Sequence, residues 1–216
     1  MKQKIIITIG RQYGSGGRII GKLLAEKLGI SFYDKEIIEM AAKKSGMSQE
    51  AFEKVDETAA SSLLYSIATS VSMFGNYVSP QVDLPLNDKL FIIQSEIIKS
   101  IAKKGSCVIV GRCADYILKD RSDIINLFIY ADKESRKKRA INEYGISSNK
   151  VDSYLHKIDK KRSTYYNHYT GEKWGNYLNY HMCLDSSILG VEGTVHMIEE
   201  FIKEREVVLE ALDKKA

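Results

Sequence analysis

The sequence has few cysteines and few prolines, and it lacks long apolar runs. Its three cysteines, Cys107, Cys113 and Cys183, are an odd number without C-x-x-C spacing, which argues against a zinc site and for free thiols in a reducing compartment. No apolar run approaches the roughly 18 residues of a membrane span, and a candidate strand begins almost at once, so we expect neither a signal peptide nor a membrane anchor. These absences predict a cytoplasmic protein.

Charge of one sign is not in large excess either. The net charge of +4, with 28% charged and 44% hydrophobic residues, indicates a soluble globular protein with local basic patches rather than one that coats nucleic acid. The four histidines show no metal-ligand spacing and no Ser/His/Asp arrangement is discernible, so we identify no metal ligand. The length of 216 residues suits a single domain, residues 1–216, around one core.

The main motif is a glycine-rich turn between a candidate strand and a candidate helix. Ile5 to Ile9 is a β-branched run typical of a buried strand, and apolar residues recur at helical spacing from Ile20 to Leu28. A glycine turn at such a junction directs backbone N–H groups and the positive end of the helix dipole to one spot, which suits a phosphate. The candidates for binding a phosphate cofactor are Arg11, Gly14, Ser15, Gly16, Gly17 and Arg18. The alternative is a connecting turn that binds nothing.

This turn differs from the standard phosphate-binding motifs. A Walker A loop has lysine and then serine or threonine after its last glycine, whereas Gly17 and Arg18 follow Gly16 here. The Rossmann pattern also fails, because Ile19 stands where its third glycine belongs. Asp34, at the end of the next candidate strand, keeps a dinucleotide-binding alternative open.

Candidate strands and helices alternate along the chain, which predicts an α/β fold with a parallel sheet and helices on both faces. We expect further strands at Ser31–Asp34, Cys107–Val110, Ile124–Tyr130 and Tyr180–Leu184. We expect helices at Lys35–Lys44, Ser48–Asp56, Thr58–Phe74, Asp88–Lys104, Lys133–Tyr144 and Lys150–Tyr166, and a final helix near the C-terminus. Ligands of such sheets bind beyond the carboxyl ends of the strands, where residues 10–18, Asp34 and residues 111–115 fall.

Two segments suggest accessory parts of a binding site. Residues 47–87 are longer than a normal crossover and suggest an acceptor-binding insertion, with a mobile loop that binds no ligand as the alternative. Residues 145–178 end in a stretch rich in Tyr, Asn, His and Gly and suggest a flexible lid. An aromatic-packed loop is the alternative there.

Several arginines could supply positive charge to a phosphate. Arg112 follows directly after a buried strand, where a ligand role is more expected than a solvated surface position. Arg136 and Arg139 lie three residues apart and share one face of a helix, which could equally be a solvated face. Asp159 and Arg162 have the same spacing and could form a local ion pair.

The chain resembles the cytidylate kinase-like branch of the nucleoside monophosphate kinases in the order and spacing of short motifs. These are the strand followed by Gly14-Ser-Gly-Gly-Arg18, Gly111-Arg112 with Asp115, the pair Arg136 and Arg139, and Asp159-x-x-Arg162. The resemblance implies a P-loop three-layer sandwich with a five-stranded parallel sheet of order 2-3-1-4-5, a helical insertion that binds the monophosphate, and a closing lid. It implies transfer of the γ-phosphoryl group of ATP, with Mg²⁺, to CMP or a related small acceptor.

By position, the resemblance also assigns roles to single residues. It implies that Gly14, Ser15 and Gly16 belong to the ATP-binding loop, although Gly17 replaces the loop's lysine and Ile19 its threonine. The implied acceptor contacts are Asp34, Arg112, Asp115 and Asp159. Asp115 lies two residues later than the aspartate of the family's Gly-Arg-Asp motif. The implied catalytic cations of the lid region are Arg136, Arg139 and Arg162.

The missing lysine leaves open which residue supplies positive charge to the β- and γ-phosphates. Arg18 or Arg11 could do so, and we hypothesise that Arg18, first in the helix, bends back towards the phosphates. The alternative is that Arg18 points to solvent or pairs with a carboxylate such as Glu26 or Asp34. Two other functions also stay open: another P-loop transferase, such as a sulfotransferase or a small-molecule kinase, and a nucleotide-binding protein without catalysis. The expected partners are small nucleotides, and a homo-oligomer is left open.

Overall fold

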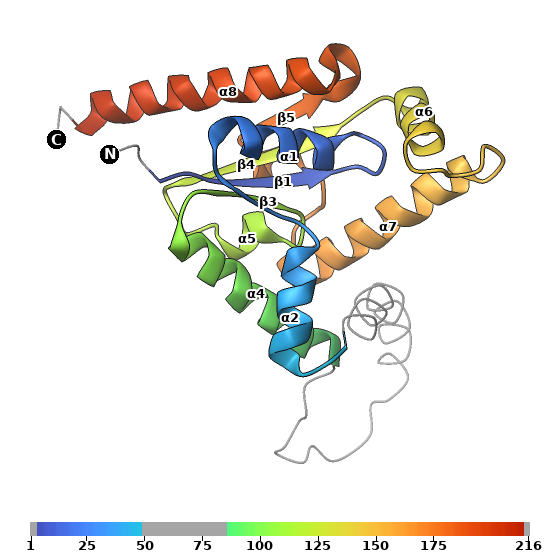
Figure 1. Cartoon of the computed structure of the whole chain (residues 1–216), viewed down its shortest axis with the longest axis horizontal. Helices are drawn as coiled ribbons and strands as arrows, with labels where there is room; N and C mark the ends of the chain where they lie inside the picture. Colours follow the sequence, from blue (N-terminus) through green and yellow to red (C-terminus); the bar gives the residue numbers. More distant parts are fainter. Residues whose placement is uncertain (1–3, 49–85, 214–216) are drawn as a thin grey trace.

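The computed structural model describes residues 4–48 and 86–213. Within these ranges, five strands form one sheet in the order β2-β3-β1-β4-β5 (Figure 1). The strands are β1 (Ile6–Arg11), β2 (Ser31–Tyr33), β3 (Cys107–Val110), β4 (Ile124–Tyr130) and β5 (Met182–Asp185). All four pairings are parallel, so the expected sheet and its strand order are confirmed.

The central strand β1 is buried on both faces because its apolar side chains alternate between them. Ile6 belongs to the core cluster on one face, and Ile7 and Ile9 belong to the cluster on the other. All three side chains are fully buried, and burial of each such side chain stabilises the fold by about 1.5–3 kcal/mol. The β1 register places Ile7 between Val108 of β3 and Ile125 of β4, which brings the ends of these strands together.

Helices cover both faces of the sheet and complete the three-layer sandwich. Helices α1 (Gly17–Leu28) and α8 (Ser186–Asp213) lie on one face, and α2 (Glu36–Ser45), α4 (Leu86–Lys104) and α5 (Ala114–Ile117) lie on the other (Figure 1). Helices α6 (Lys133–Asn142) and α7 (Val151–Thr170) lie at the end of the sheet to which β1 points, and the short 3-10 helix η1 (Tyr177–Asn179) precedes β5. Helix α8 consists of two helical pieces, because Gly190 has a non-helical φ of 66° and ψ of −171°.

Most boundaries lie within a few residues of the sequence-based expectations. Helix α7 runs to Thr170 rather than Tyr166, because the first left-handed residue is Gly171, with φ 71°. Helix α5 was not expected, since four residues carry too short a pattern to recognise. The helices expected at 48–56 and 58–74, and nearly all of the insertion expected at 47–87, lie outside the described residues. Closure of residues 145–178 as a lid stays a prediction.

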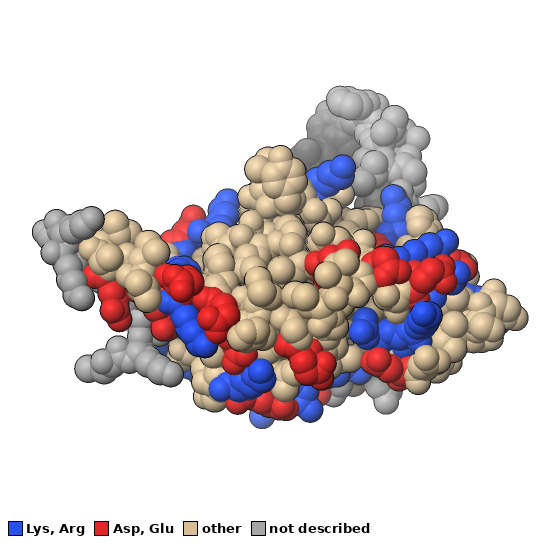
Figure 2. Space-filling view, turned by 90° about the horizontal axis from the view of Figure 1, so that it is seen from above, with Lys and Arg blue, Asp and Glu red and all other residues tan. Residues whose placement is uncertain are grey.

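The surface carries both signs of charge. Figure 2 shows that acidic and basic side chains are mixed over the face seen there, without a broad area of one sign. No helix within residues 4–48 and 86–213 combines the length and the apolar composition needed to cross a bilayer.

Candidate active site

The glycine-rich loop between β1 and α1 adopts a conformation that only glycine takes without strain. Gly14 and Gly16 have φ of 78° and 79°, in the left-handed region, and Gly16 is the N-cap of α1. Within the described part of the chain, the backbone N–H groups of Gly14 and Gly16 donate to no other group. Free N–H groups together with the N-terminus of α1 form the kind of site that binds a phosphate.

The loop is held in place through its carbonyl oxygens by arginines from α6 and α7. The donors and acceptors are Arg162 Nη1 to the Arg11 carbonyl at 3.1 Å, Arg136 Nε to the Tyr13 carbonyl at 2.7 Å, and Arg139 Nη1 to the Gly14 carbonyl at 2.8 Å. The sequence predicts that these arginines act on phosphates, and their catalytic role stays a prediction. In this structure they bind the backbone of the loop that would hold the phosphates.

Asp159 acts in the same set of contacts. Its Oδ1 accepts a hydrogen bond from the Tyr13 N–H at 2.8 Å, and its Oδ2 binds Arg136. It also lies 3.9 Å from Arg162, so the local ion pair expected from the sequence is present at the edge of the distance range. The contact of Asp159 with an acceptor stays a prediction, because here it joins α7 to the loop.

Arg18 pairs with Asp34 across the start of α1. The Nε of Arg18 donates to Oδ2 of Asp34 at 2.6 Å, while Nη2 of Arg11 lies 3.6 Å from Oδ1 of the same carboxylate. The Arg18 side chain is 54% exposed and that of Asp34 only 12%. This arrangement corresponds to the alternative in which Arg18 pairs with a nearby carboxylate, and its role at the phosphates stays a prediction.

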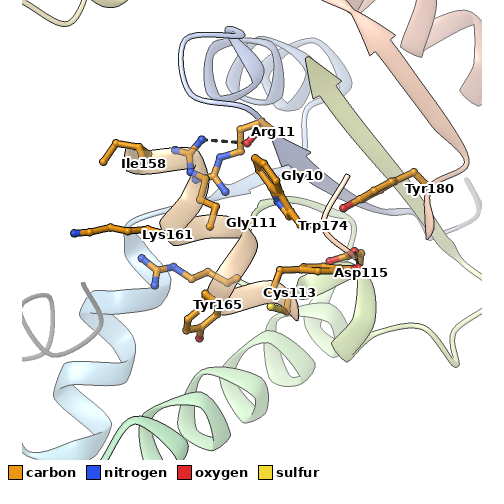
Figure 3. Close-up of a pocket in the computed structure, with 13 residues that line it drawn as sticks. Gly10, Arg11, Gly111, Cys113, Asp115, Ile158, Lys161, Tyr165, Trp174 and Tyr180 are labelled. Carbon is orange, nitrogen blue, oxygen red and sulfur yellow. Dashed lines mark hydrogen bonds between the residues drawn. The ribbon is translucent and has the colours of Figure 1, made fainter. Parts of the chain in front are cut away.

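A pocket of about 240 Å³ opens beside the loop, between the ends of β1 and β3 and one face of α7 (Figure 3). Its lining residues are Gly10, Arg11, Gly111, Arg112, Cys113, Asp115, Ile158, Lys161, Arg162, Tyr165, Tyr166, Trp174 and Tyr180. Four residues expected at the site from the sequence therefore meet in one cavity: Arg11, Arg112, Asp115 and Arg162. Asp34, Arg136, Arg139 and Asp159 are not part of its lining.

Apart from Arg162, the pocket residues of α7 were not named from the sequence, although a signal for them was present. Ile158, Lys161, Arg162, Tyr165 and Tyr166 follow the i, i+3, i+4, i+7, i+8 spacing of a single helix face. That pattern mixes apolar, aromatic and cationic side chains, which is not typical of a helix face that packs on a hydrophobic core. A mixed face on a helix next to a phosphate loop could have identified them.

Two residues after β3 carry backbone strain at the pocket wall. Arg112 and Cys113 have φ of 59° and 54°, in the left-handed region that residues other than Gly and Asn rarely adopt. Such conformations cost about 1–3 kcal/mol each and persist where the surrounding structure imposes them. Because both residues line the pocket, the strain supports a functional role for the turn that carries them.

The pocket has more positive than negative charge. Burial and the nearby Arg162, Arg112 and Arg18 together lower the pKa of Arg11 to about 9, against the raising effect of Asp34. Burial also lowers the pKa of Arg162, which Asp159 and Asp34 partly offset. Neighbouring cations that lower one another's pKa form a site that an anion would stabilise.

One carboxylate, Asp115, lies at the other side of the pocket from Lys161, next to Tyr180 (Figure 3). Asp115 is 9% exposed and accepts a 2.8 Å hydrogen bond from the Tyr166 hydroxyl. Burial raises the pKa of Asp115, and the hydrogen bond from Tyr166 acts in the opposite direction. The pKa of Tyr166 is raised by its own burial and by the charge of Asp115, so the hydroxyl remains a donor.

Comparisons with known proteins agree with this geometry. A model of the cytidylate kinase-like family matches residues 6–188, which include the loop and every residue of the pocket lining. A cytidylate kinase from Pyrococcus horikoshii is 26% identical over 219 positions, covering 99% of this chain and 96% of that protein.

Solved structures show the same fold. The crystal structure of an uncharacterized protein from Eubacterium ventriosum superimposes with a TM-score of 0.67 and 29% identity, covering 93% of this chain and 99% of that one. A shikimate kinase from Bacteroides thetaiotaomicron, with a TM-score of 0.53 and 12% identity, covers 93% of this chain and 99% of its own and shares the fold alone. The P-loop kinase fold and the phosphotransferase character of the family are thereby supported, and the chain belongs to the cytidylate kinase-like family.

Proposed function

We propose that this protein transfers the γ-phosphoryl group of ATP to a small acceptor that itself carries a phosphate, with CMP as the first candidate. The observation that carries the proposal is the cationic pocket beside the phosphate loop. Arg11, Arg112, Lys161 and Arg162 line it, whereas Asp115 is the one carboxylate among its described lining residues. The match to the cytidylate kinase-like family and the cytidylate kinase relative support CMP over other acceptors.

The donor phosphates would lie on the glycine-rich loop. Its unpaired N–H groups and the N-terminus of α1 favour the negative charge of ATP. Three arginines already bind the loop's carbonyl oxygens, so the loop keeps its shape without the nucleotide. Such preorganisation reduces the cost of ordering the loop when ATP binds.

Mg²⁺ would arrive with ATP and neutralise charge on its β- and γ-phosphates. Within the described residues no group of three or more His, Cys, Asp or Glu side chains could hold a metal ion by itself. Mg²⁺ is commonly bound by one or two carboxylates together with substrate phosphates. Asp34, near the loop, would have to exchange its contacts with Arg18 at 2.6 Å and Arg11 at 3.6 Å for a contact with the ion.

The chemical step needs positive charge and positioning more than proton transfer. The bond between the γ-phosphorus and the β–γ bridging oxygen breaks, and its electron pair remains on ADP. A phosphate oxygen of CMP forms the new bond to phosphorus and yields CDP. Because that oxygen is already ionised near neutral pH, the pocket arginines and Lys161 hold and orient the acceptor, and no general base is required.

The aromatic side of the pocket suits the base of a nucleotide. Trp174, Tyr165 and Tyr180 line it, and Trp174 is itself supported by an edge contact to Phe128 at 5.4 Å between ring centroids. Aromatic faces stack on bases without strong base preference. The carboxylate of Asp115 would add a hydrogen-bond acceptor for a group on the base.

A coupled assay of ADP release tests the proposal. With ATP and Mg²⁺, CMP should be turned over, whereas cytidine should not, because it lacks the phosphate that the cationic pocket binds. UMP, AMP and shikimate complete the panel and define the acceptor class. Turnover of cytidine or shikimate alone would contradict a monophosphate acceptor. ATP binding without any turnover would favour a nucleotide-binding protein without catalysis, and stabilisation by phosphoadenylyl sulfate but not by ATP would favour a sulfotransferase.

A further inference from the structure

The position that carries the lysine in a Walker A loop is Gly17 in this chain, and a neighbouring side chain fills the space beside it. A Cβ added to Gly17 would lie 2.6 Å from Cβ of Arg11 and 3.2 Å from its Cγ. No side chain can therefore grow from position 17 while Arg11 keeps its place. Gly17 has an ordinary helical conformation, since its φ is not among the positive values, so backbone geometry does not require a glycine there.

The Arg11 side chain then crosses from the loop towards the end of β3. A Cβ added to Gly111 would overlap Nη1 of Arg11, and Gly111 has φ of 76°. Nη2 of Arg11 lies 3.6 Å from Asp34, and the side chain is 20% exposed. Two glycines thus leave a channel for one guanidinium, which ends in the wall of the pocket (Figure 3).

Arg18 occupies a different environment. Its side chain is 54% exposed, and its Nε donates a 2.6 Å hydrogen bond to Oδ2 of Asp34. Arg11 is more buried and keeps only a longer contact with the same carboxylate. Of the two arginines that flank the loop, Arg11 is the one whose charge lies between the loop and the acceptor pocket.

We propose that Arg11 supplies the positive charge that the loop lysine supplies in a Walker A motif, and that Gly17 is a glycine because Arg11 fills the lysine's space. The proposal rests on the proposed function, since it assigns Arg11 to the phosphoryl group passing from ATP to the acceptor. Arg11 approaches this group from the end of β1 instead of from the first turn of α1. The lowered pKa of Arg11 agrees with a cation held among other cations until a phosphate arrives.

The test moves the positive charge from position 11 to position 17. Arg11→Met removes the charge and keeps most of the volume, and it should lower turnover on the order of a thousandfold, as loss of a transition-state cation does. Gly17→Lys alone should also be impaired, because its side chain meets Arg11. The double variant Arg11→Gly with Gly17→Lys should recover at least about tenfold over Arg11→Gly, because glycine removes the Cβ that meets position 17 and charge returns from the Walker A position.

A matched control separates charge from relief of crowding. Arg11→Gly with Gly17→Ala makes the same space but carries no cation, so it should not recover turnover. Arg18→Ala should lose much less turnover than Arg11→Met. Equal turnover of the two double variants, with both folded by thermal unfolding, would overturn the proposal. So would a larger loss from Arg18→Ala than from Arg11→Met.

Calorimetric titration with ATP and with ADP tests the proposal without any acceptor. The wild-type preference for ATP over ADP should fall about tenfold in Arg11→Met, because a charge-assisted contact with the terminal phosphate is lost. The preference should return in Arg11→Gly with Gly17→Lys. An unchanged ratio in Arg11→Met would overturn the role of Arg11. A wild-type protein that binds ATP but does not phosphorylate CMP would overturn the proposed acceptor alone.

Discussion

Asp159, on α7, accepts a 2.8 Å hydrogen bond from the backbone N–H of Tyr13 in the phosphate loop. The same carboxylate binds Arg136, which donates in turn to the Tyr13 carbonyl at 2.7 Å. One side chain therefore joins α6, α7 and the loop, and the loop cannot move far without breaking a largely buried ion pair.

Asp159→Ala should lower the free energy of unfolding by about 3 kcal/mol, because it leaves the largely buried Arg136 without its charge partner. It should also raise the KM for ATP, because the loop loses one of its supports. Asp159→Asn keeps an acceptor for the Tyr13 N–H and should have a smaller effect on both. Urea denaturation and ATP titration measure the two effects. Wild-type stability in Asp159→Ala would show that the contact contributes little.

Gly16→Val should weaken ATP binding by at least ~1.4 kcal/mol, a tenfold effect. Gly16 has φ of 79°, and a Cβ there would lie 3.2 Å from the Arg139 guanidinium carbon, so a side chain both strains the loop and crowds it. The matched control is Gly29→Val, at φ of 66° with nothing within 4 Å of an added Cβ. It imposes similar backbone strain away from the loop. Calorimetric ATP affinity that is unchanged in a folded Gly16→Val variant would remove the phosphate-binding interpretation.

Arg112→Met should raise the acceptor KM strongly and leave ATP affinity nearly unchanged. Arg112 lines the pocket at the end of β3, where its planar guanidinium can bind a phosphate through two hydrogen bonds. Arg205→Met is a suitable control, because Arg205 donates to the Ser122 carbonyl and is not part of the pocket lining. Steady-state kinetics with varied CMP and varied ATP separate the two substrates. A fall in ATP affinity would instead assign Arg112 to the donor side.

The stability contribution of Asp115 should decrease as pH rises. Burial raises its folded-state pKa above the unfolded value, so between these two pKa values the native state binds more protons than the unfolded state. The contribution is therefore fully present below the unfolded pKa and is lost as pH rises through the folded pKa. Asp115→Asn cannot ionise and should remove this loss, so it should gain stability relative to the wild type between about pH 4 and neutral pH.

Asp132 provides a control of opposite sign. Its carboxylate caps α6 by accepting from the Ser135 N–H at 2.9 Å, and hydrogen bonds from Ser135 lower its pKa to about 2. Its contribution is present above the unfolded pKa and is lost as pH falls towards 2. The difference in free energy of unfolding between each Asn variant and the wild type should be measured as a function of pH. It should rise with pH for Asp115→Asn and fall with pH for Asp132→Asn. Parallel slopes would contradict the assignment for Asp115.

Local patterns were sufficient for the strands and for the longer described helices. Strands β3 and β4 run over Cys107–Val110 and Ile124–Tyr130, as the sequence predicted, because short apolar runs between polar or glycine residues are local features. Helix α1 begins at Gly17 and ends at Leu28 before the left-handed Gly29 for the same reason. The edge of the sheet at which the pocket lies also followed, since parallel strands bring their carboxyl ends to one edge.

The partners of the arginines were decided only by the tertiary structure. Helical spacing predicted that Arg136 and Arg139 share a face, but the loop carbonyls that they bind lie 123 and 125 residues earlier in the chain. Likewise, nothing in the spacing of residues 10–18 shows that the side chain of Arg11, rather than that of Arg18, fills the space next to the Gly17 Cα. Periodicity reflects backbone geometry within a few residues, whereas the end of a long arginine side chain goes where packing leaves space and opposite charge. That space exists only once β1, β3 and α1 have come together.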